Sequence, residues 1–128
     1  MGALAISGSI WEGSGATIMS RSYLNSGSAI TQATISTLTY KVFDLSSTAP
    51  TTATSTGSFT VASVVFDTLQ TDAIWTADST GYNFKAAMTA ASFPDGDRVY
   101  RVEVKFTPSS GQAWYQVWLV DSAETYSE

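Results

Sequence analysis

The fold class is decided by the stretch Tyr100-Arg101-Val102-Glu103-Val104-Lys105-Phe106. Apolar and charged side chains alternate here with a period of two, as expected for a β-strand that has one buried and one solvated face. The apolar set is Tyr100, Val102, Val104 and Phe106, and the charged set is Arg101, Glu103 and Lys105. We therefore predict a half-buried antiparallel strand.

A return strand follows directly in the sequence. Pro108 and Gly111 indicate a turn, because proline presets the corner and glycine accepts positive φ. The next run, residues 114–120, is apolar on both faces, with Trp114, Trp118 and Val120 on one and Tyr115, Val117 and Leu119 on the other. We predict a hairpin over roughly residues 99–121, whose second strand is central in its sheet or covered on both sides.

Other segments show strand patterns of the same kind. The expected strands, placed by alternation or by β-branched runs, are 38–44, 59–66, 82–88, 3–11, 17–24 and 30–35. Residues 45–58 are rich in Ser, Thr and Ala and predict a flexible loop or an extended sheet edge, and residues 86–93 hold a short helical turn. This rhythm predicts an all-β antiparallel sandwich of the Ig-like kind, with a small β-barrel or a jelly roll as the alternative.

The 128 residues fit one domain. We assign residues 1–35 to an N-terminal arm or the first strands, and residues 36–128 to the core of the same single sandwich. The irregular first 35 residues are also a candidate for an arm that becomes ordered against a neighbouring protein.

Composition excludes several kinds of function. The chain has no histidine and no cysteine, so the commonest general base, the commonest zinc ligand and any thiolate chemistry are missing. Its net charge is −5, with six scattered basic residues, which argues against nucleic acid and anionic membranes as partners. We predict a protein that is not an enzyme and needs no cofactor.

Carboxylates on one loop raise the question of a metal. Asp67, Asp72 and Asp78 lie five and six residues apart, and oxygen ligands on a loop can hold calcium. The EF-hand spacing is absent, however, and aspartates commonly close turns with their own side chains. We predict turn capping and no metal here, and the same for Asp95-Gly96-Asp97.

Aromatic residues supply the candidate contact surface. Four tryptophans in a small domain suit either a protein interface or a sugar-stacking site. The predicted interface comprises Trp11 and Tyr23 in the N-terminal segment with Trp114, Tyr115 and Trp118 in the hairpin.

The region from about residue 60 to 120 resembles small proteins of tailed-phage genomes. The likeness lies in Val64–Asp72, in Trp75-Thr76, Asp78 and Gly81–Phe84, and in Tyr100–Pro108 followed by Gly111. It implies a virion structural protein, at the capsid surface or in the head-to-tail region, and transfers no catalytic residue. The first 35 residues carry no such likeness.

From these observations we expect a structural component of a tailed-phage virion. It would act as a capsid decoration or cement protein, or as a head-tail (neck) protein, through contacts with other virion proteins and as a homo-oligomer or symmetric array. The alternative is a carbohydrate-binding β-sandwich module for host-surface recognition, in which Trp114 and Trp118 stack against sugar rings.

Overall fold

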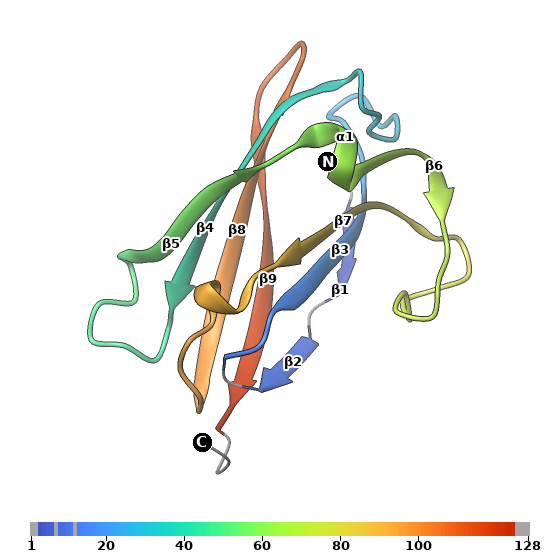
Figure 1. The fold of residues 1–128 in the computed structure, drawn as a ribbon. Coiled ribbons are helices and arrows are strands. Elements are labelled where there is room, and N and C mark those ends of the chain that lie inside the picture. Colours follow the sequence, from blue (N-terminus) through green and yellow to red (C-terminus); the bar gives the residue numbers. More distant parts are fainter. Residues whose placement is uncertain (1–2, 7, 12, 125–128) are drawn as a thin grey trace.

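The computed structural model describes residues 3–6, 8–11 and 13–124. Strands dominate them, joined by short turns, with one α-helical turn and one 3-10 turn (Figure 1). In chain order the elements are β1 (Ala3–Ile6), β2 (Gly8–Trp11), β3 (Ala16–Ser22), β4 (Ile35–Asp44), β5 (Ala53–Phe59), α1 (Val61–Val64), β6 (Val65–Gln70), β7 (Tyr82–Met88), η1 (Ala90–Ser92), β8 (Arg98–Pro108) and β9 (Trp114–Ala123).

The strands form two sheets packed face to face. One has four strands in the order β1-β3-β7-β6, and the other has five in the order β2-β9-β8-β4-β5. Every neighbouring pair is antiparallel except β2 and β9, which run parallel. The predicted all-β sandwich is confirmed, and the predicted hairpin is the β8-β9 pair, with Phe106 opposite Trp114.

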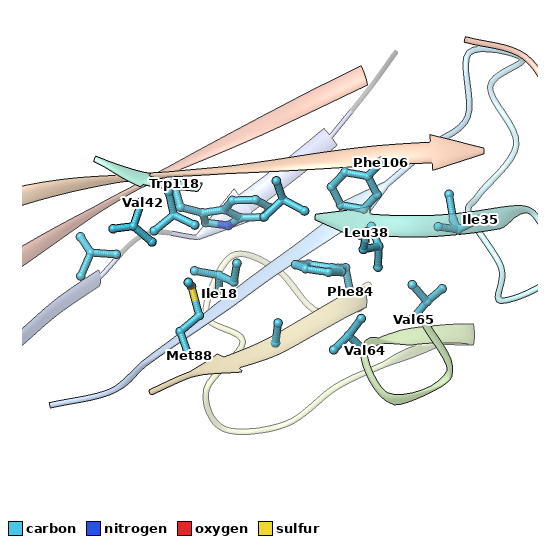
Figure 2. Packing of buried hydrophobic residues seen from close by; sticks show 14 of the residues in the cluster. Ile18, Ile35, Leu38, Val42, Val64, Val65, Phe84, Met88, Phe106 and Trp118 are labelled. Atoms are coloured by element: carbon cyan, nitrogen blue, oxygen red, sulfur yellow. The ribbon is translucent and has the colours of Figure 1, made fainter. Parts of the chain in front are cut away.

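The core fills the space between the sheets. The alternation in β8 places Tyr100, Val102, Val104 and Phe106 inside, as predicted. Phe84 on β7 meets them from the opposite sheet, with its ring 5.2 Å from that of Phe106 and 5.6 Å from that of Trp118 (Figure 2). These large rings pack with the aliphatic side chains of both sheets into one core, whose burial stabilises the fold.

Two hydrogen bonds tie the sheets together inside this core. Nε1 of Trp118 on β9 donates to the backbone oxygen of Met19 on β3 at 3.0 Å, and the Ser22 hydroxyl donates to Oε1 of Gln116 at 2.6 Å. Because Ser22 donates its proton to Gln116, Ser20 is the donor in the 2.6 Å contact between the two serine hydroxyls. The buried polar groups are thus satisfied across the sandwich.

Three sequence predictions need correction. Residues 59–66 are not one strand: β5 ends at Phe59, Val61–Val64 makes a helical turn, and β6 begins at Val65, because the chain crosses here from one sheet to the other. Tertiary position overrides the β-branched preference. The predicted strand over 30–35 is not formed either: residues 32–34 are a turn, because the Thr34 hydroxyl bonds both the backbone nitrogen and the backbone oxygen of Thr31, and Ile35 begins β4.

The third concerns the predicted strand over 3–11, which is divided between the two sheets as β1 and β2; residue 7 lies outside the described residues. Both alternatives for residues 45–58 hold in part: residues 45–52 are a loop, and Ala53–Phe59 is the edge strand β5. Neither helical turn in the described part of the chain has the length or apolar run needed to cross a bilayer.

Candidate functional site

The most distinctive surface is the solvent side of the five-stranded sheet, which we call the outer sheet face. Cross-strand register places its side chains in three rows over β4, β8 and β9. The rows are Thr39-Lys105-Tyr115, Lys41-Glu103-Val117 and Phe43-Arg101-Leu119.

An apolar stripe runs along β9 on this face. Tyr115 is 60% exposed, Val117 38% and Leu119 46%, whereas the alternate residues of the same strand are buried. Trp11, which is 62% exposed, pairs in register with Ala123 and therefore extends the same side of the sheet. Four of the large apolar side chains that this structure exposes thus share one sheet face.

Basic side chains flank the stripe. Arg101 forms an ion pair with Glu103, Nε to Oε2 at 2.7 Å, which leaves Lys41 and Lys105 without an ion-pair partner among the described residues. The Lys105 ammonium lies 5.9 Å from the centre of the Tyr115 ring, within reach of a cation–π contact. The outer sheet face is therefore apolar along Tyr115, Val117 and Leu119 and basic beside them, and the exposed Asp121 separates these residues from Trp11.

Two shallow hollows indent this face on either side of Glu103. One, of about 210 Å³, lies between the strands around Lys41, Lys105 and Tyr115. The other, of about 370 Å³, is lined by Phe43, Leu45, Pro50, Thr51, Arg101 and Glu103. Such relief lets a partner side chain insert as an anchor.

The prediction that the second strand of the hairpin is central in its sheet or covered on both sides is met by the first alternative. β9 is internal in its sheet, but its outer face is exposed and is not covered by the part of the chain that the structure describes. Conversely, Trp114 and Trp118, which were expected at the contact surface, are 5% and 0% exposed. Trp114 stacks on Phe106 with ring centres 5.3 Å apart. Both indoles therefore belong to the core and not to an exposed stacking surface.

The remaining predicted contact residues are placed differently. Trp11 and Tyr115 are exposed on the outer sheet face. Tyr23 follows β3 of the other sheet, is half-buried, and accepts a 3.1 Å hydrogen bond from Nε of Arg21. Tyr23 is therefore separate from the surface that Trp11 and Tyr115 share.

The aspartates of the 67–78 segment act as loop braces. Asp72 accepts hydrogen bonds from the backbone nitrogens of Ile74 and Trp75, from the Tyr82 hydroxyl at 2.8 Å and from Lys85 Nζ at 2.9 Å. These contacts fold the 71–81 loop over the four-stranded sheet, where Trp75 packs with Met19 and Tyr82.

A second brace closes the same loop. Asp78 accepts from Nε1 of Trp75 at 3.0 Å, from the backbone nitrogens of Thr80 and Gly81, and from Arg21, whose Nη1 lies 2.7 Å from Oδ2. Asp67 lies apart and accepts from the backbone nitrogen of Gln32 at 2.7 Å.

Electrostatics agree with a structural role for these carboxylates. The Lys85 ammonium, followed by the Tyr82 hydroxyl, lowers the pKa of Asp72 to about 2. The indole of Trp75 and the Arg21 guanidinium hold the pKa of Asp78 far below its ordinary value. In the described ranges, no three Asp or Glu side chains group closely enough to hold a metal ion. These oxygens are occupied by donors, as capping requires.

Comparison with protein-family models, with curated proteins and with solved structures finds no match. The structure by itself defines the class of this protein as an all-β sandwich with one exposed apolar sheet face. The sequence places Val117 and Leu119 with Tyr115 on the face of this strand opposite Trp114 and Trp118, but it does not single out Val117 and Leu119 as contact residues. Their alternation with the buried tryptophans puts them on the exposed face.

Proposed function

We propose that this chain is a non-enzymatic contact module that binds other proteins through its outer sheet face. The observation that carries the proposal is the exposed stripe Tyr115, Val117 and Leu119 on β9. Burying one large apolar side chain contributes up to about 1.5–3 kcal/mol, so three neighbours can drive association. Contiguous exposed apolar surface on a small domain is typical of an interaction site.

The rest of the face suits the same role. Thr39 and the ion-paired Arg101 and Glu103 form a polar margin beside the stripe, and the two hollows accept side-chain anchors. An aromatic or apolar centre with a polar rim is the usual composition of a protein interface. Lys41 and Lys105 favour a partner that presents carboxylates.

We place this module in the virion of a tailed phage, as a capsid decoration or cement protein or as a neck protein. The sequence resemblance over residues 60–120 supports that setting. The strand order also favours the Ig-like variety of sandwich. Named in chain order as A, A′, B, C, C′, D, E, F and G, the strands form sheets A-B-E-D and A′-G-F-C-C′, which contain the Ig-type sets ABED and CFG.

The second candidate function is a carbohydrate-binding module. Its aromatic residues would be Tyr115 and Trp11, in place of the expected Trp114 and Trp118. Tyr115 borders the hollow beside Lys41 and Lys105, and Trp11 extends the same side of the sheet. A sugar ring could stack on Tyr115. Glycan-array binding that is lost in Tyr115→Ala, with the fold retained, would favour this candidate over a protein partner.

The test of the leading proposal is made on purified phage particles. Mass spectrometry should detect the chain in virions, and Val117→Asp should abolish its incorporation because a carboxylate then lies in the apolar stripe. Leu69→Asp is the matched control, since Leu69 is 43% exposed on β6 of the other sheet. Absence of the chain from particles would refute the virion setting, and normal incorporation of Val117→Asp would refute the proposed face.

A further inference from the structure

The free edge of the five-stranded sheet is a second interaction surface. β5 is the last strand of its sheet and pairs only with β4 among the described residues. Figure 1 shows it along one margin of the molecule, with β4 on one side and no strand on the other. An edge strand presents backbone N–H and C=O groups that can pair with a strand of another molecule.

This edge carries little of the usual protection against such pairing. Soluble proteins commonly block a sheet edge with lysines, prolines or bulges. No charged residue occurs anywhere between Leu45 and Phe66, and Pro50 precedes the strand. One irregularity lies where the register with β4 shifts near Thr54, so Ser55–Phe59 remains as a regular pairing segment.

The segment is also held rigid. The ring of Phe59 stacks on that of Tyr40 with centres 4.8 Å apart. Tyr40 is the cross-strand partner of Gly57, and its ring lies directly over that glycine. A strand that is already extended and anchored loses little conformational freedom when a second strand pairs with it.

We propose that this edge pairs antiparallel with the same edge of a second copy of the chain, across a two-fold axis. Such an axis brings identical or nearby residues of the two strands together. A charge here would face a like charge, whereas the exposed Thr56 and Ser58 offer small hydroxyl side chains that pair favourably across strands. The uncharged edge therefore suits a second copy.

The dimer would join two five-stranded sheets into one of ten strands. The two-fold axis of an antiparallel pair is perpendicular to the sheet, so both outer sheet faces point the same way and can bind a common surface bivalently. Self-association through β5 does not depend on which protein binds the outer sheet face, so this inference goes beyond the proposed function. A short strand pair buries little area, so the dimer is weak and depends on concentration.

Sedimentation velocity over about a thousand-fold range of protein concentration, from micromolar to millimolar, tests the proposal. The wild-type chain should shift from its mass of 13.6 kDa toward twice that mass. Ser58→Lys and Ser58→Glu should each remain monomeric, and an equimolar mixture of the two should recover the dimer. Thr39→Lys is the matched control, because Thr39 is the exposed cross-strand neighbour of Ser58 on β4 and should leave the dimer intact.

The outcomes separate this inference from the proposed function. A wild-type chain that stays monomeric throughout, or a dimer that survives both Ser58 variants, would overturn the edge pairing. A dimer that is lost in Thr39→Lys but kept in Ser58→Lys would also overturn it and would point to the outer sheet face. Circular dichroism confirms that each variant is folded. Val117→Asp should leave the dimer unchanged, even if it abolishes incorporation into virions.

Discussion

The hydroxyl of Ser22 on β3 donates a 2.6 Å hydrogen bond to Oε1 of Gln116 on β9, deep between the two sheets. This bond, with the Trp118–Met19 bond beside it, connects the sheets in a domain that has no cysteine to cross-link them. Because both partners are buried, loss of one leaves a polar atom without its donor.

Ser22→Ala should therefore lower the free energy of unfolding by about 1–3 kcal/mol, measured by urea denaturation. Gln116→Leu in the same chain should recover part of this loss, since the acceptor is then gone as well. Ser26→Ala, in an exposed turn, is the control and should change stability by less than about 0.5 kcal/mol. Equal effects of Ser22→Ala and Ser26→Ala would contradict the buried bridge.

Truncation of a side chain should lower the stability of the fold much more on the buried face of β9 than on the exposed face. Trp118→Ala removes a fully buried indole and should destabilise the fold by about 3–5 kcal/mol. Tyr115→Ala, on the exposed face of the same strand, should change stability by only about 0.5 kcal/mol. Denaturant unfolding of both variants decides the point. A large loss in Tyr115→Ala would mean that this face is packed against the domain itself.

A side chain at position 57 would displace the ring of Tyr40, which stacks on Phe59. A Cβ at this position would lie 2.6 Å from the tyrosine oxygen and 2.7 Å from two ring carbons. We expect Gly57→Ala to destabilise the chain by about 1–3 kcal/mol through overpacking, measured as a shift in the urea midpoint. In a Tyr40→Ala background the same substitution should have almost no effect. Equal losses in the two backgrounds would disprove the steric cause.

Acid should weaken the brace between the 71–81 loop and β7. The pKa of Asp72 is about 2, below its ordinary value of 3.8, so the ionised form favours the folded state. Its contribution to stability is complete above about pH 4 and is lost as the pH falls toward 2. Asp72→Asn should flatten this part of the stability–pH curve. The control is Asp97→Asn, a change at an exposed turn, which should leave the shape of the stability–pH curve unchanged. An unchanged curve in Asp72→Asn would contradict the brace.

The sequence predicts the fold best where one face of a strand is charged. Arg101, Glu103 and Lys105 identify the solvated side of β8, so its orientation follows from alternation alone. β9 has apolar residues on both sides, and parity cannot say which side is covered. Trp114 stacks on Phe106, its partner in the hairpin, on the inner face. The indole of Trp118 lies inward against the ring of Phe84, which belongs to the opposite sheet and is distant in sequence.

Other features escape the sequence for related reasons. β5 is made of small polar residues with no apolar alternation, and only its pairing with β4 makes it a strand. Asp72 and Asp78 were expected to cap turns, and their backbone contacts agree with that. Their ion pairs with Lys85 and Arg21 were not foreseeable, because each joins residues on separate elements.

The central claim is that the outer sheet face is covered in the assembled particle. Hydroxyl-radical footprinting of Tyr115, on the free chain and on purified virions, tests it most directly. Tyr115 should be oxidised readily in the free chain and protected in the particle, while Ile74, 51% exposed on the loop beside the other sheet, should react similarly in both. Oxidation of Tyr115 at the same rate in free chain and particle would contradict the account.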